Sequence, residues 1–129
     1  MKKERNYPHS DLTRKIIGVA YKVYNKLGYG FLVQVYRNAM AVELKKSGMD
    51  VKDEHKITVY YDGEVVGDYK ADLIVDDAVI IELKSVETLL PIHEAQLVNY
   101  LKATGIEIGL LINFGKKVDV KRKIFTNTK

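Results

Sequence analysis

Apolar residues recur at steps of three and four residues over the first third of the chain, which is the spacing of a helix that buries one side. The first such stretch predicts a helix over residues 11–27 that ends at Gly28. A second stretch covers residues 32–44 and stops at Gly48. The chain is therefore expected to begin with a pair of helices.

The pattern then changes to alternation of apolar and polar residues, as in strands that bury one face. Alternation from Ile57 to the turn sequence Asp62-Gly63 predicts one strand, and residues 65–75 predict the strand that pairs with it. Residues 78–84 predict a third strand after the turn at Asp76-Asp77. Three consecutive strands joined by short turns form a meander.

The last third of the chain predicts a helix followed by strands. Pro91 is typical of the first helical position and Gly105 of the position after the last turn, so a helix is expected over residues 92–104. Residues 108–114 are continuously apolar, as in a strand buried on both faces. Residues 118–125 predict a final strand.

This order of elements predicts a single layered α/β domain over residues 1–129. With 47% hydrophobic and 29% charged residues, the chain has the composition of an ordinary soluble domain. It contains no cysteine, which excludes disulfides, thiolate metal sites and cysteine nucleophiles, and a reducing cytoplasm is the expected location. Its apolar runs are far shorter than a membrane span, so no membrane role is expected.

Positive charge lies mainly at the two ends of the chain. The formal net charge is +4, and residues 1–5 and 116–129 are rich in lysine and arginine, whereas the segment between them is acidic overall. Basic ends could contact the phosphate groups of nucleic acid. The alternative interpretation is an edge strand and a tail that lysine keeps soluble.

Most side chains with catalytic potential lie in one short stretch, which contains Asp72, Glu82 and Lys84. In a strand, Glu82 and Lys84 leave the sheet on the same face. Two carboxylates beside a lysine suit a hard divalent cation and the chemistry of phosphoryl groups. Alternating glutamate and lysine are also common on exposed strands, so the tripeptide alone leaves both interpretations open.

The register between the second and third strands decides whether these carboxylates meet. A two-residue turn at Asp76-Asp77 would pair Asp72 with Ile81 and point its side chain away from Glu82. A metal site therefore requires a three-residue loop, a bulge or a splayed strand end at this position.

The pattern Asp72-x9-Glu82-x-Lys84, followed by Gln96-x3-Tyr100, resembles the PD-(D/E)xK nuclease superfamily. The resemblance implies a restriction-endonuclease-like core, in which a helical pair, a three-strand meander, a helix and further strands form a mixed central sheet flanked by helices. The chain more narrowly resembles the small bacterial and archaeal GxxExxY proteins. That resemblance lies in GYGFLVQVY at 28–36, DLIV at 72–75, IELK at 81–84, HEAQLVNYL at 93–101 and GLLINFG at 109–115.

The resemblance implies a metal-dependent nuclease that hydrolyses phosphodiester bonds in nucleic acid, with DNA as the expected substrate. Asp72, Glu82 and the carbonyl group of Leu83 would bind Mg²⁺ or Mn²⁺. Lys84 would position the attacking water, and the product would carry a 5′-phosphate.

The same resemblance places Gln96 and Tyr100 beside the active site as further catalytic residues. They lie one helical turn apart and share a helix face, and a polar helix flank is the alternative interpretation. We expect His93 to be a surface residue near the start of its helix. His9 and His55 have no carboxylates at a metal-ligand spacing and are expected on the surface.

One position departs from the family pattern. In Gly30-x-x-Val33-x-x-Tyr36 the glutamate that gives the family its name is replaced by valine. The second hypothesis is therefore a catalytically degenerate domain that binds nucleic acid or a protein partner. If Val33 faces the core, the change affects packing only. A homodimer formed through a tyrosine-rich helical face is a third hypothesis.

Overall fold

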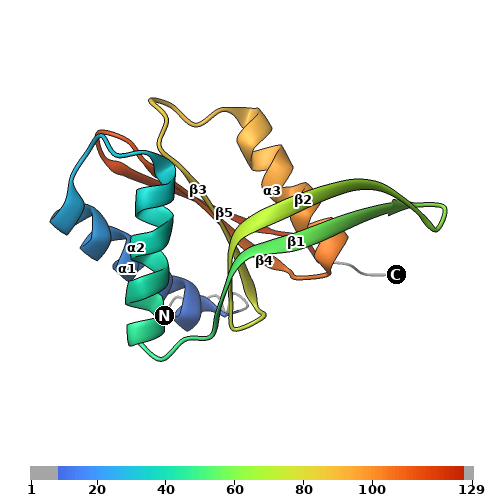
Figure 1. The fold of residues 1–129 in the computed structure, drawn as a ribbon, viewed down its shortest axis with the longest axis horizontal. Helices are drawn as coiled ribbons and strands as arrows, with labels where there is room; N and C mark the ends of the chain where they lie inside the picture. The colour runs from blue at the N-terminus through green and yellow to red at the C-terminus, as the bar shows by residue number, and fades with distance from the viewer. Residues whose placement is uncertain (1–8, 127–129) are drawn as a thin grey trace, which may run out of the picture.

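A five-stranded mixed sheet organises residues 9–126, the part of the chain that the computed structural model describes (Figure 1). The strands lie side by side in chain order: β1 (Val51–Tyr61), β2 (Glu64–Val75), β3 (Val79–Lys84), β4 (Ile108–Phe114) and β5 (Val118–Ile124). β3 and β4 are parallel and all other neighbours are antiparallel. The predicted meander and mixed sheet are confirmed.

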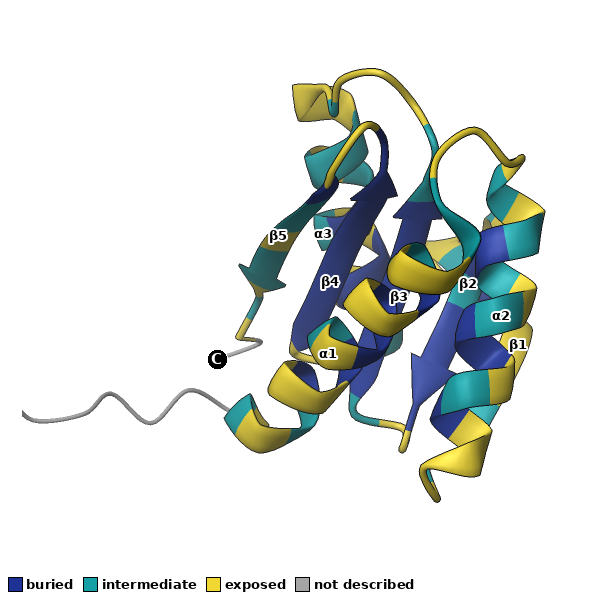
Figure 2. Cartoon of the chain, turned by 90° about the vertical axis from the view of Figure 1, so that its left-hand side faces the viewer, coloured by how far each residue is buried: buried dark blue, intermediate teal, exposed yellow. Residues whose placement is uncertain are grey.

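Helices cover both faces of this sheet (Figure 2). Helices α1 (Ser10–Leu27) and α2 (Val33–Lys46) pack on one face over the larger apolar core. Helix α3 (Pro91–Thr104) connects the parallel strands β3 and β4 and packs on the other face over a smaller core. β4 is buried along its whole length, which agrees with its continuous apolar sequence. No helix within residues 9–126 is long and apolar enough to cross a membrane.

The connection between α1 and α2 is tied to the sheet by Tyr36. Gly28 ends α1 with a φ of 79°, which glycine adopts without strain. The Tyr36 hydroxyl donates a hydrogen bond to the carbonyl of Gly28 at 2.5 Å, and the ring of Tyr36 stacks on Phe114 with centroids 4.4 Å apart. The start of α2 is therefore fixed next to the carboxyl end of β4.

The turn between β2 and β3 has three residues, 76–78, and this number sets the register. Val75 pairs with Val79 and Leu73 pairs with Ile81, so continuing the register places Asp72 opposite Glu82. Asp76 adopts a φ of 53°, which aspartate tolerates better than most residues. Its side chain accepts a hydrogen bond from the Asp50 N–H at 2.8 Å, which holds the turn against the start of β1.

The hairpin of β1 and β2 separates from the rest of the sheet. β2 pairs with β3 over three residue pairs only, and the outer part of the hairpin projects from the body (Figure 1). Its tip is the predicted turn, in which Asp62 and Gly63 both have positive φ, as a two-residue hairpin turn requires. The projecting part carries exposed apolar side chains, among them Tyr61 and Val66.

Helix α3 approaches β4 closely because position 109 is glycine. A Cβ atom on Gly109 would lie 2.7 Å from Cδ1 and 2.9 Å from Cγ of Leu97, a fully buried residue of α3. No carbon atoms pack at such distances, so any side chain at this position would force the helix or the leucine to move. The glycine therefore sets the distance between α3 and the sheet.

We predict that Gly109→Ala lowers the free energy of unfolding by about 1–3 kcal/mol, because it overpacks a tight contact. Urea denaturation measures this change. Gly18→Ala is the matched control, since Gly18 lies on the exposed side of α1 and a Cβ there meets no atom within 4 Å. That control should raise the stability by about 0.5–1 kcal/mol. Equal stability of Gly109→Ala and the wild type would show that α3 has room to move.

Candidate active site

Two carboxylate side chains meet where β2 and β3 separate. The Asp72 N–H donates a hydrogen bond to Oε1 of Glu82 at 2.9 Å, and the Leu83 N–H donates one to Oδ2 of Asp72 at 2.8 Å. These bonds lie just beyond the last paired residues, Leu73 and Ile81. The carboxylates therefore accept hydrogen bonds from backbone N–H groups that lie beyond the last residue pair of β2 and β3. Each carboxylate binds the backbone of the strand opposite its own.

Each carboxylate uses one oxygen for this backbone contact. Within residues 9–126, Oδ1 of Asp72 and Oε2 of Glu82 accept no hydrogen bond. Two carboxylate oxygens, together with the nearby Leu83 carbonyl, make a donor set that suits a hard divalent cation completed by water or phosphate. No group of three or more acidic or histidine side chains that could hold a metal ion occurs in the described part of the chain, so a cation at this pair would receive two carboxylates from the protein.

Burial and mutual repulsion make these carboxylates reluctant to ionise. Glu82 is only 7% exposed, and burial together with the charge of Asp72 raises the pKa of Glu82 to about 8. Burial also raises the pKa of Asp72, and the hydrogen bond from the Leu83 N–H opposes this effect. A nearby positive charge would favour the ionised form of both groups.

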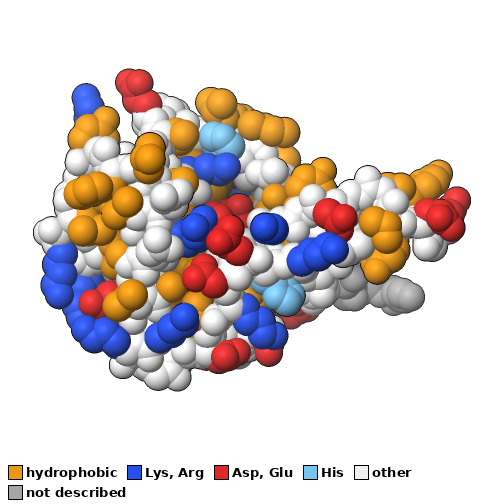
Figure 3. All heavy atoms as spheres, viewed as in Figure 1, with side chains coloured by type: hydrophobic (Ala, Val, Ile, Leu, Met, Phe, Trp, Pro, Cys, Tyr) orange, Lys and Arg blue, Asp and Glu red, His pale blue; other side chains and the backbone are white. Residues whose placement is uncertain are grey.

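Two cationic side chains of the protein lie near the acidic pair. The charge of Lys84, on the same face of β3 as Glu82, lowers the pKa of both carboxylates in part. The guanidinium of Arg37 on α2 acts in the same direction on the pKa of Asp72. Acidic and basic side chains gather where the hairpin joins the body (Figure 3).

Arg37 is a residue that the sequence analysis missed. It pairs with Asp53 at 3.9 Å and with Glu54 at 3.7 Å, and its Nε atom is buried without a hydrogen-bond partner among residues 9–126. Val33 stands at the position of the family glutamate, and a spacing of four residues places Arg37 on the same side of α2. This spacing was the signal in the sequence that could have identified Arg37.

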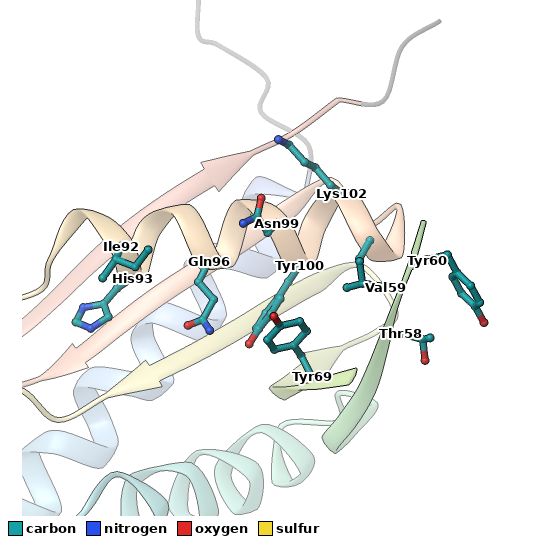
Figure 4. A pocket seen from close by; sticks show the side chains of 11 residues that line it. Thr58, Val59, Tyr60, Tyr69, Ile92, His93, Gln96, Asn99, Tyr100 and Lys102 are labelled. Carbon is teal, nitrogen blue, oxygen red and sulfur yellow. The ribbon is translucent and has the colours of Figure 1, made fainter. Parts of the chain in front are cut away.

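Gln96 and Tyr100 project from the same side of helix α3, and Tyr100 lies beside Tyr69 of β2 (Figure 4). Tyr100 is buried, and the charges of Glu82 and Asp72 add to the effect of burial, which raises the pKa of Tyr100 to about 12. Its hydroxyl thus stays protonated near the acidic pair and can donate a hydrogen bond. Gln96 is half-buried and lines the same cavity as Tyr100.

The remaining candidates lie outside the acidic pair. Val33 is half-buried and packs against the larger core, so its side chain offers no ligand. His93 accepts a hydrogen bond through Nδ1 from the Leu90 N–H at 3.0 Å and so caps the start of α3. His9 and His55 are exposed, as predicted.

Asn113 holds the segment that follows Lys84. Its amide donates a hydrogen bond to the carbonyl of Val86 at 2.8 Å and accepts one from the Val86 N–H at 2.9 Å. Asn113 is also the register partner of Lys84 across the parallel pair β3 and β4. The buried amide therefore fixes the backbone on the far side of Lys84, although the sequence analysis gave it no role.

The sequence model of a family described as the PD-(D/E)XK nuclease superfamily matches residues 10–124. Two solved structures are similar to the chain. The crystal structure of SSO0001 superposes with a TM-score of 0.60 at 19% identity and covers 93% of this chain. That of an alkaline exonuclease (LHK-Exo) from Laribacter hongkongensis gives 0.52 at 13% identity and covers 96%.

The chain spans 61% of the length of the SSO0001 chain and 72% of that of the exonuclease. No curated protein matches the sequence. The structural likeness and the mixed five-stranded sheet with three helices establish a restriction-endonuclease-like fold, as the sequence predicted.

The high pKa of Glu82 predicts that the metal-free protein becomes less stable as the pH rises. An unfolded glutamate has a pKa near 4.5, so between about pH 4.5 and pH 8 the folded state holds a proton that the unfolded state has lost. Unfolding then releases a proton in this window, and the free energy of unfolding falls with increasing pH. Urea denaturation in the presence of EDTA measures the decrease.

Glu82→Gln should flatten this pH dependence, because the variant has no carboxyl group to ionise at this position. The exposed carboxylate of Glu87 supplies the matched control, Glu87→Gln, which should keep the slope of the wild type. An unchanged slope in Glu82→Gln would contradict the raised pKa.

Proposed function

Because the chain belongs to the PD-(D/E)XK nuclease superfamily, we propose that it is a metal-dependent nuclease that hydrolyses phosphodiester bonds in nucleic acid. One observation carries this proposal above the others. Asp72 and Glu82 are held together by reciprocal backbone hydrogen bonds, and each keeps one oxygen available. A protein gains nothing in stability from two carboxylates that share a desolvated site, so their convergence points to a function that involves a cation.

The donor set fits Mg²⁺ or Mn²⁺, with Asp72, Glu82 and the Leu83 carbonyl as the residues that would hold it. Such an ion supplies positive charge that stabilises the developing negative charge on a phosphodiester under attack. Residues of the chain would do the rest. The Lys84 ammonium would hold and orient the attacking water, and the guanidinium of Arg37 would offset the charge of a bound phosphate.

Helix α3 would contribute groups on the substrate side of the same site. Tyr100, with its pKa raised to about 12, remains protonated and would donate a hydrogen bond to a phosphate or sugar oxygen. The amide of Gln96 can donate and accept hydrogen bonds next to it.

We propose DNA as the substrate, a 5′-phosphate product and a cytoplasmic location. A homodimer stays a prediction that size-exclusion chromatography tests.

Val33 supports a second candidate function, a degenerate domain that binds nucleic acid or a protein partner without cleavage. We place the chain with the GxxExxY proteins on the motifs quoted above, and Val33 replaces the glutamate of that pattern. Its half-buried side chain packs against apolar neighbours and supplies no acceptor to the site. The intact pair of Asp72 and Glu82 favours the enzyme over this alternative.

We expect this protein to cleave labelled nucleic acid when Mg²⁺ or Mn²⁺ is present and not in EDTA. Single- and double-stranded DNA and RNA are the substrates to compare. Glu82→Gln and Lys84→Met should each lower the rate by about 100-fold or more, because each removes a charged group that acts on the reacting phosphate or water. Mn²⁺ should also raise the Tm of the wild type but not that of Glu82→Gln.

The exposed residues Lys15 and Glu87 provide controls, since Lys15→Met and Glu87→Gln make the same changes of charge outside the acidic pair and Lys84. If Val33→Glu cleaves a substrate and the wild type does not, the degenerate domain is favoured over the enzyme. If wild type and Val33→Glu both fail to cleave every substrate, the nuclease proposal is wrong and the family relation concerns the fold alone.

A further inference from the structure

A cavity of about 870 Å³ opens between α3 and the projecting part of the β1–β2 hairpin. It exists because the hairpin leaves the sheet beyond Leu73, so that α3 faces β1 and β2 across a gap (Figures 1 and 4). We call it the hairpin groove. It is lined by Thr58, Val59, Tyr60 and Tyr69 from the hairpin and by residues of α3 that include Gln96, Asn99, Tyr100 and Lys102.

Two tyrosine rings form the inner wall of the hairpin groove. The ring centroids of Tyr69 and Tyr100 are 5.6 Å apart, and the rings are tilted by 46°. Tyr100 is buried, whereas Tyr69 is 47% exposed and presents part of its ring to the groove. Gly67 leaves room for that ring, since a Cβ there would lie 3.3 Å from Cε2 of Tyr69. The exposed aromatic surface is therefore held in place by its neighbours.

The hairpin groove lies beside the candidate active site, although the two carboxylates are not part of its lining. Tyr100 and Gln96 belong to both, and the charges of Glu82 and Asp72 act on the Tyr100 hydroxyl. A molecule in the groove would thus lie next to a group bound at the acidic pair. This proximity favours an occupant that is joined covalently to a phosphodiester bound at the acidic pair.

The chemistry of the lining fits unpaired nucleobases. Aromatic surface stacks on the faces of bases, and the amides of Gln96 and Asn99 can donate and accept hydrogen bonds at base edges. Of the described residues that line the groove, Lys102 is cationic and none carries a carboxylate, so the lining itself does not repel a phosphate backbone. A base inside a duplex is stacked on its neighbours and does not offer a face to such a wall.

We propose that the hairpin groove binds bases of a single-stranded nucleic acid, stacked on Tyr69, beside a phosphodiester at Asp72 and Glu82. The proposal rests on the proposed nuclease function for the position of that phosphodiester. It makes single strands, or ends at which strands have separated, the substrate class of the site.

Fluorescence anisotropy with a labelled twelve-residue oligo(dT), measured in EDTA so that no cleavage occurs, tests the proposal. Tyr69→Ala should weaken the binding of the single strand by about tenfold, which is the effect of losing one stacked base. Tyr69→Phe should retain binding, because it keeps the ring. The matched control is Tyr21→Ala on α1, since Tyr21 is 46% exposed but lies outside the groove.

A duplex of the same length and label should bind more weakly than the single strand, and Tyr69→Ala should not change its affinity. Asn99→Glu is a second variant, in case Tyr69→Ala fails to fold. Asn99 is exposed on α3, and a carboxylate there would repel the backbone of the strand and weaken its binding.

Hydrolysis of bis(4-nitrophenyl) phosphate with Mn²⁺ separates this proposal from the nuclease proposal, because that diester carries neither a nucleobase nor a nucleic-acid chain. Its hydrolysis by wild type and Tyr69→Ala alike, with single-strand binding lost only in Tyr69→Ala, supports both proposals. If no hydrolysis occurs but the single strand binds through Tyr69, the groove stands and the nuclease function fails.

Two results would overturn the groove proposal. The first is equal affinity of wild type, Tyr69→Ala and Asn99→Glu for the single strand. The second is a dimer in sedimentation experiments that Tyr69→Ala dissociates without any change in oligonucleotide affinity, because a second copy of the chain would then be the occupant.

Discussion

Two carboxylates that share a buried site repel each other and lose their hydration, so a fold can keep them together only through other contacts. Here the contacts are two hydrogen bonds that run in opposite directions across the end of a strand pair. The backbone of Asp72 donates to Glu82, and the backbone next to Glu82, at Leu83, donates to Asp72. Burial of the apolar side chains of β2 and β3 around this pair offsets the unfavourable free energy of bringing the two carboxylates together.

The same strand separation creates both the site and the hairpin groove. While β2 stays paired with β3, its backbone is satisfied and its side chains face one of the two cores. Where it departs, two backbone N–H groups need new acceptors, and the carboxylates provide them. Beyond that point the hairpin is far enough from β3 and β4 for α3 to form the opposite wall of the groove. One change in strand pairing thus places the acidic pair and the aromatic wall of the groove next to each other.

Small details of packing keep these parts in register. Gly109 allows α3 to approach β4, and this approach carries Gln96 and Tyr100 toward the acidic pair. Asn113 pairs with both polar groups of the Val86 backbone and so restrains the chain just after Lys84. Neither residue offers chemistry of its own to a substrate. Both are needed because the site is assembled from three separate elements, two strands and a helix.

The sequence by itself determined the elements, because hydrophobic periodicity, the proline at 91 and the glycines at 28, 63 and 105 act locally. It also singled out Asp72, Glu82 and Lys84 as candidate site residues, since alternation along a strand puts the last two on one face. It left the register of β2 against β3 open, because a turn of two residues and a turn of three are both compatible with Asp76-Asp77. Only the tertiary structure decided this, through the contact of Asp76 with Asp50, which is distant in the sequence. Arg37 and Tyr69 likewise gained their places from helix and hairpin packing, which no local pattern encodes.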